Sequence, residues 1–251
     1  MITDPLFYLV AVPAVILVGL AKGGFGGAIS MLGVPLMALT ISPVAAAGIM
    51  LPILLLMDIV GLFAWRGTYD RALLRLILPA SVIGVGLGFL TATMVSANGV
   101  RFLVGALCLL FAAHWFVTAR HRIAPKAPDK ARGFFWGVIS GFTSFATHAG
   151  GPPFQVYVMP LRLEPPVYAG TTVIFFAVTN ALKVIPFFLL GQLSPDNLAT
   201  SAVLLPLAPL ATLGGVWLVK RVDRERFYVV TTALLVPVGL KLVYDSVIGF
   251  L

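Results

Sequence analysis

The stretch Lys22-Gly23-Gly24-Phe25-Gly26-Gly27 interrupts the apolar start of the chain and sets a pattern that recurs later. It separates an apolar run at 6–21 from one at 28–40, which is shorter than the roughly 20 residues that a membrane-spanning helix needs. A second break, Thr147-His148-Ala149-Gly150-Gly151-Pro152-Pro153, precedes another short run at 153–161. A glycine cluster releases the backbone from helical geometry, and Pro152 suits the first turn of a new helix.

The composition is that of an integral membrane protein. Of 251 residues, 60% are hydrophobic and 10% charged, whereas soluble domains carry about 25% charged residues. This excludes a soluble enzyme, a disordered protein and a secreted disulfide scaffold, and the single Cys108 excludes a disulfide or a cysteine metal cluster. We assign the net charge of +8 to cytoplasmic loops rather than to nucleic-acid binding. Residues 1–5 contain no Lys or Arg, so we expect no cleavable signal peptide.

The apolar segments are predicted to be helices, because a chain in lipid must satisfy its backbone hydrogen bonds internally and the runs are too long for barrel strands. They cover 6–21, 28–40, 44–65, 73–95, 99–119, 133–147, 153–161, 166–190, 198–219 and 227–248.

The two halves of the chain repeat the same order of features. A shift of 122 residues aligns Pro43 with Pro165, Gly48 with Gly170 and Asp58 with Asn180, and it superposes the two breaks. Slightly larger shifts align later features of the halves. Internal repeats of this kind are the usual construction of secondary transporters.

The distribution of basic residues favours one of two topologies. Thirteen of the 17 Lys and Arg lie at 66–75, 120–132, 162 and 220–226, and none lies at 40–43 or 191–197. Basic loops stay in the cytoplasm, a rule that a plain eight-span topology of two parallel halves violates. If each break and its short helix fold back as a re-entrant pair, all four basic regions lie inside and both termini outside. We prefer this inverted arrangement and keep the parallel one as the alternative.

The predicted fold is therefore an all-α polytopic membrane protein of two inverted repeats. Each repeat has a re-entrant or broken helix pair and three long transmembrane helices. Residues 1–119 form the first repeat, 120–132 a basic cytoplasmic linker and 133–251 the second repeat.

The breaks and their surroundings resemble the TauE/SafE family of sulfite and organosulfonate exporters. The resemblance lies in Gly23–Gly27 with Gly33-Val34-Pro35-Leu36, in the start of the next helix at Pro43, Ala47 and Gly48, and in 137–141 through 150–153. The second break departs from the family in Phe145, His148 and its paired prolines, where glycines are more usual. The resemblance implies movement of sulfite, sulfoacetate, taurine-derived and similar anions.

Four charged or amide residues are candidates for the substrate site. Charged groups inside a membrane usually face a cavity, so we expect Lys22 to attract an anion; the alternative is a lysine that reaches to a lipid headgroup. Asp58 and Asn180 occupy matching positions, and Asp58 is expected to pair with Lys22 or Lys183 or to carry a proton. Lys183 lies three residues after Asn180 on the same helical face, which we expect to line the site.

The breaks supply the other candidates. Backbone N–H groups at the start of a half-helix bind anions, which selects Gly26, Gly27, Gly150 and Gly151; close helix packing is the alternative. We expect Gly27→Val and Gly151→Val to abolish binding, and Gly88→Ala on a long helix to have little effect.

Hydroxyl and imidazole groups complete the set. Ser30 and Thr147, with Thr143 and Ser144, are candidate donors to the anion; the alternative is that they bond their own helix. His148 is expected to donate to the anion or to titrate near neutral pH and couple export to protons, the alternative being a neutral ring bonded to a carbonyl.

These features predict a secondary transporter that exports small sulfur-containing anions by alternating access, with a passive anion channel as the alternative. No P-loop is present, so ATP does not drive it directly. We expect no enzyme activity, catalytic residue, cofactor or metal. The expected partners are a small anionic substrate, the lipid bilayer and a second copy of the chain in a homodimer, without nucleic acid. The expected location is the bacterial inner membrane, crossed several times.

Overall fold

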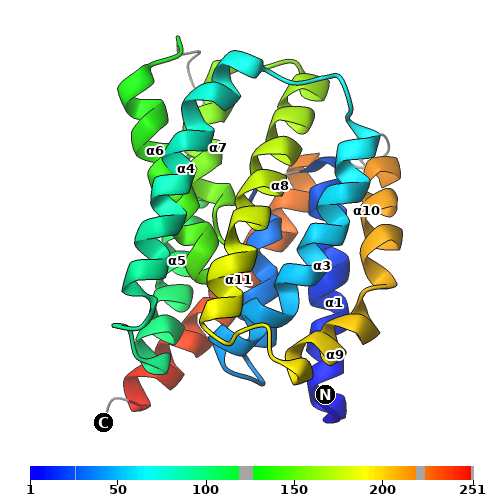
Figure 1. Ribbon diagram of the computed structural model, residues 1–251, viewed down its shortest axis with the longest axis vertical. Coiled ribbons are helices and arrows are strands. Elements are labelled where there is room, and N and C mark those ends of the chain that lie inside the picture. The colour runs from blue at the N-terminus through cyan, green and yellow to red at the C-terminus, as the bar shows by residue number, and fades with distance from the viewer. Residues whose placement is uncertain (26, 119–126, 219–223, 250–251) are drawn as a thin grey trace.

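The computed structural model of the protein is a bundle of helices that stand along one long axis (Figure 1). It describes residues 1–25, 27–118, 127–218 and 224–249, and every regular element in these ranges is helical. The first half contains α1 (Pro5–Leu20), the π-helical turn η1 (Ala21–Phe25), the 3₁₀ helix η2 (Gly27–Leu32), α2 (Gly33–Met37), α3 (Pro43–Ala64), α4 (Arg71–Ala92) and α5 (Ala97–Thr118). The second half contains α6 (Lys130–Thr147), α7 (Gly151–Val158), the 3₁₀ turn η3 (Met159–Leu161), α8 (Pro165–Leu189), α9 (Pro195–Leu204), α10 (Leu207–Leu218) and α11 (Arg224–Ile248).

Local sequence signals account for where these helices begin. Side chains cap several first turns by accepting from a backbone N–H, as Ser42 does for Ala45 and Asp70 does for Leu73. Proline opens α1, α3, α8 and α9, where its fixed φ suits the first helical turn and its missing N–H is not needed.

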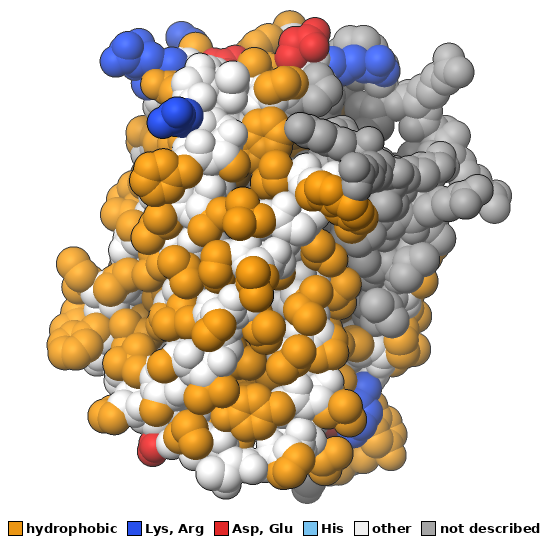
Figure 2. Space-filling model, turned by 90° about the vertical axis from the view of Figure 1, so that its right-hand side faces the viewer, with side chains coloured by type: hydrophobic (Ala, Val, Ile, Leu, Met, Phe, Trp, Pro, Cys, Tyr) orange, Lys and Arg blue, Asp and Glu red, His pale blue; other side chains and the backbone are white. Residues whose placement is uncertain are grey.

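The outer surface and the helix lengths are those of a polytopic membrane protein. Five described helical segments are long and apolar enough to cross a membrane, and the bent pair α9 and α10 would make a sixth. Large apolar side chains such as Leu90, Leu110 and Ile185 are about two-thirds exposed. On the face seen in Figure 2, hydrophobic side chains cover the middle of the molecule, and Lys and Arg gather mainly at its upper end. A lipid environment accounts for this apolar surface.

The two Gly-rich breaks each turn the chain back. In Figure 1, α1 and α3 both begin at the lower end, so the segment η2–α2 returns to the end from which α1 entered. Likewise α6 and α8 both begin at the upper end, and α7 returns to it. The short helices expected at 28–40 and 153–161 are confirmed as η2–α2 and α7–η3. The two hairpins enter from opposite ends, and α7 contacts η2 inside the bundle.

The halves are interleaved rather than packed as separate bodies. Helix α1 of the first half packs on α10 of the second, and α6 of the second half packs on α4 of the first. Helix α5 pairs with α11, and α3 with α8. Small residues allow these close crossings: a Cβ on Gly23 would lie 2.3 Å from the Thr212 carbonyl oxygen, and one on Gly84 would lie 2.1 Å from that of Val138.

Two sequence-based expectations about the long helices are wrong. The segment at 198–219 is a pair of helices bent by 45°, because Pro206 stands between α9 and α10 and has no N–H to continue the helical hydrogen bonds. Gly88→Ala would not be innocuous, since its Cβ would lie 2.7 to 2.8 Å from three atoms of Phe145. Gly86 of α4 has no neighbour within 4 Å of an added Cβ, so it is a helix glycine that tolerates a methyl group.

The arrangement in Figure 1 predicts which ends of the helices face the cytoplasm. The N-terminus and the described end of α11 lie at the lower end, and the connection between α3 and α4, which contains Arg66, lies at the upper end. In a Cys108→Ala background, we expect Thr40→Cys to be labelled by a membrane-impermeant thiol reagent only from outside and Tyr69→Cys only from the cytoplasm. The opposite labelling would contradict the predicted orientation.

Candidate functional site

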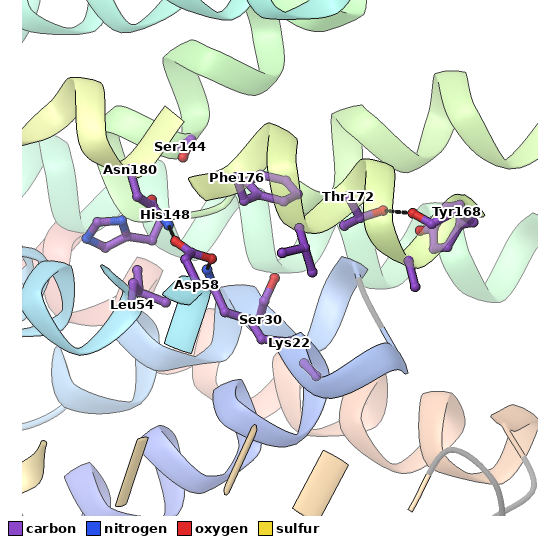
Figure 3. Close-up of a pocket in the computed structure, with 13 residues that line it drawn as sticks. Lys22, Ser30, Leu54, Asp58, Ser144, His148, Tyr168, Thr172, Phe176 and Asn180 are labelled. Atoms are coloured by element: carbon purple, nitrogen blue, oxygen red, sulfur yellow. Dashed lines mark hydrogen bonds and ion pairs between the residues drawn. The ribbon is translucent and has the colours of Figure 1, made fainter. Parts of the chain in front are cut away.

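A chain of three polar side chains crosses the centre of the bundle and joins the two halves. Lys22 on η1 forms an ion pair with Asp58 of α3, and the Asn180 amide of α8 donates to the other carboxylate oxygen at 2.6 Å. Figure 3 shows Lys22 and Asn180 reaching Asp58 from opposite sides. Asp58 and Asn180 are buried. The positions that the repeat aligned are therefore in direct contact, and of the two lysines expected as partners Asp58 pairs with Lys22.

These three residues line a common cavity. Its described lining residues are Ala21, Lys22, Ser30, Leu54, Asp58, Ser144, His148, Tyr168, Ala169, Thr172, Val173, Phe176 and Asn180. Lys22 is the one Lys or Arg among them. The charged pair lies at one end of the cavity with His148 and Asn180, whereas Phe176 gives the middle of the α8 wall an apolar surface (Figure 3). Thr172 and Tyr168 lie farther along the same wall. Such a cavity fits a small anion with an apolar part.

The sequence analysis expected the face of α8 that carries Asn180 to line the site, but it missed the other residues of this α8 wall. Ala169, Thr172, Val173 and Phe176 precede Asn180 at spacings of three and four, which places them on one face of a helix. Applying that periodicity backwards from Asn180 would have found them. Tyr168 is tied to α7 by the Gln155 amide, which donates to its hydroxyl at 3.2 Å.

Lys183 and His148 form a second polar cluster directly behind the cavity wall. Lys183 is fully buried and is not among the described lining residues. Its Nζ donates to the Ser144 carbonyl at 3.0 Å and hydroxyl at 3.1 Å, and it lies 2.6 Å from His148 Nδ1. The other ring nitrogen of His148 lies 3.0 Å from the Ala47 carbonyl oxygen. His148 therefore stands between the cavity and Lys183.

The backbone of His148 explains how its ring reaches this place. His148 ends α6 with φ 55° and ψ 19°, a left-handed conformation that few non-glycine residues adopt. Its N–H donates to the Ser144 carbonyl at 3.0 Å, and Ala149 N–H to that of Thr143 at 3.2 Å. These bonds close the end of α6 and turn the chain toward α7.

The second break offers few backbone donors to an anion. Helix α7 begins at Gly151, and Pro152 and Pro153 have no N–H, while Phe154 N–H donates to the Gly150 carbonyl at 3.3 Å. The first turn of α7 can thus supply at most the Gly151 N–H. Gly150 and Gly151 are buried but are not among the described residues that line the cavity.

The remaining candidates have distinct places. Ser30 of η2 lines the cavity, whereas the Thr147 hydroxyl is buried and donates to the Thr143 carbonyl of its own helix at 3.3 Å. Gly27 begins η2, and Gly26 lies outside the described residues. Within the described part of the chain, no three His, Cys, Asp or Glu side chains are close enough to hold a metal ion.

Comparison with known proteins identifies the family. A family model described as "Sulfite exporter TauE/SafE" matches residues 11–242, nearly the whole chain. The chain belongs to the TauE/SafE family. The resemblance seen in the glycine motifs is thereby confirmed, and the family's name describes exporters. No curated protein and no solved structure shows a significant match to the chain.

Proposed function

We propose that the protein is a secondary transporter that exports small sulfur-containing anions such as sulfite, sulfoacetate or other organosulfonates. The observation that carries the proposal is the central cavity of a TauE/SafE-family membrane protein, where one lysine and several hydrogen-bond donors from both halves converge. A sulfonate has three acceptor oxygens, so several converging donors suit it.

Side chains supply most of the proposed anion contacts. Lys22 provides the positive charge, and the hydroxyls of Ser30 and Ser144 and the amide of Asn180 surround it in the same cavity. Asp58 holds Lys22 while the site is empty, and an incoming anion competes for the ammonium. The apolar surface of Val173 and Phe176 receives the organic part of the substrate.

The proposed mechanism is alternating access between two inverted halves. Two hairpins that enter from opposite ends, and reciprocal packing of α1 on α10 and α6 on α4, support a two-fold relation between the halves. On α8 the cavity extends from Asn180 toward Tyr168, near the upper end of the bundle. If each of the two hairpins adopted the conformation that the other has now, the cavity would open toward the lower end of the bundle instead. The proposal includes a location in the bacterial inner membrane, with the basic upper end in the cytoplasm.

Transport into proteoliposomes tests this function. We expect saturable flux of sulfite or sulfoacetate, with competition by organosulfonates, weaker competition by sulfate and none by dimethyl sulfone, a neutral isostere. Saturation and competition follow from a discrete binding cavity. Flux proportional to concentration without competition would favour the passive channel, to which the family comparison gives no support. Absence of flux for every sulfur anion would contradict the proposal.

A further inference from the structure

Lys183 and His148 are two basic side chains that lie buried against each other. Anion binding in the cavity does not by itself explain why this pair is present. Among the described residues, no carboxylate forms an ion pair with Lys183, and its hydrogen-bond partners are a carbonyl, a hydroxyl and an imidazole. A lysine without a countercharge is costly inside a membrane and usually marks an ion or proton pathway.

The geometry limits this pair to one extra proton. The Ala47 carbonyl oxygen can only accept, so the His148 nitrogen beside it, Nε2, carries a hydrogen. The other nitrogen, Nδ1, lies 2.6 Å from Lys183 Nζ. An ammonium can donate across this distance to a neutral ring, or a protonated ring can donate to a neutral amine. Two protonated groups would point hydrogens at each other, so the pair carries a charge of zero or +1.

Because of the charges around the Lys183–His148 pair, the pair binds a proton more tightly when an anion occupies the cavity. Lys22 and Asp58, the charged groups of the adjoining cavity, neutralise each other. A monoanion in the cavity therefore faces a neutral site when the pair is unprotonated, and a site of charge +1 when it is protonated. His148 lines the cavity, so the positive charge lies next to the bound anion. By linkage, whatever the proton contributes to anion binding, the anion contributes to proton binding.

We propose that the Lys183–His148 pair is the coupling site of the transporter, which takes up one proton as the anion binds and releases it when the anion leaves. The proton resides between Nζ and Nδ1, and no other bond changes. Each transport step then carries one anion and one proton together. This inference rests on the proposed function and adds the coupling ion to it.

Calorimetric titration with methanesulfonate tests the inference, because this probe stays a monoanion from about pH 5.5 to 8.5. Titrations in two buffers of different ionisation enthalpy report the protons taken up. For the unmodified protein we expect uptake rising with pH toward one proton per anion. Where the free pair is unprotonated, affinity should fall about tenfold per pH unit. Lys183→Met should bind more weakly, with less uptake, because only His148 Nδ1 remains to accept the proton. Lys183→Met combined with His148→Asn removes both basic groups and should show no uptake and no dependence on pH. Lys241→Met, an exposed lysine paired with Asp245, should match the unmodified protein.

Asp58 is the competing source of a titrating group, because an anion that captures Lys22 releases its carboxylate. Asp58→Asn distinguishes the two: uptake that persists in it and disappears in the double variant Lys183→Met with His148→Asn supports the pair. Uptake lost only in Asp58→Asn, or binding without proton exchange in the unmodified protein, overturns the inference and leaves the proposed function intact. Failure to bind methanesulfonate, sulfite or sulfoacetate overturns both. His148→Asn, which tolerates the left-handed backbone, provides a second variant should Lys183→Met not fold.

Discussion

Lys22→Gln should weaken sulfonate binding roughly 10- to 150-fold, because a hydrogen bond to a charged group contributes about 1.5–3 kcal/mol. The substitution removes the one Lys or Arg among the described residues of the cavity and leaves the Asp58 carboxylate facing the anion. Lys22→Arg keeps the charge and should retain part of the affinity. Calorimetry on the purified variants, with circular dichroism to confirm the fold, measures the effect.

A double variant separates binding from charge balance. Lys22→Gln alone leaves a buried carboxylate without its cation, which by itself destabilises a protein. Lys22→Gln combined with Asp58→Asn removes both charges and keeps a hydrogen-bond partner for Asn180. We expect this variant to fold normally and still bind weakly. Binding at the level of the unmodified protein would mean that Lys22 serves only to neutralise Asp58.

The fold was largely predictable, because membrane helices are specified by apolar length and by the residues that interrupt them. The two short segments after the breaks were expected from glycine clusters and appear at 27–37 and 151–161. Pro206 was visible but its effect was not, since Pro79 lies inside α4 without ending it. A proline leaves a backbone carbonyl without its helical hydrogen bond, and whether the helix bends depends on which neighbouring groups satisfy that carbonyl. These neighbours come from other helices, so the local sequence does not reveal them.

The sequence predicted which charged and amide residues belong to the site. It was less informative about the direction in which their side chains point. Lys22, Asp58 and Asn180 stood out because charged and amide groups are rare in an apolar chain, and the repeat aligned two of them. The interpretation of Lys183 as a wall residue differs from the structure, in which its side chain reaches the end of α6 behind His148. Three residues along a helix give one face only within about 60°, enough to point a long side chain at a different neighbour.

Gly150→Ala should lower both sulfonate affinity and stability, because its Cβ would meet backbone as well as the cavity wall. The added atom would lie 2.7 Å from the Ser140 carbonyl oxygen, 2.8 Å from Ser144 Cβ and 3.0 Å from Phe176 Cε1. No rotamer relieves the contact with the carbonyl, so α6 and α7 must separate, and Ser144 and Phe176 move with the cavity they line. Overpacking of this kind costs about 1–3 kcal/mol, and we expect at least about a tenfold loss of affinity.

Two matched glycines show whether the loss belongs to the site. Gly105→Ala would place a Cβ 2.9 Å from the Gly239 carbonyl oxygen between α5 and α11, neither of which contributes a described lining residue. It should lower the melting temperature and leave the affinity of the folded protein unchanged. Gly86→Ala, with open space around its Cβ, should change neither. Thermal shift and calorimetry on the three proteins give both quantities. If Gly150→Ala loses stability but binds as tightly as Gly105→Ala, the second break only packs helices, and Gly151→Val should then leave binding intact as well.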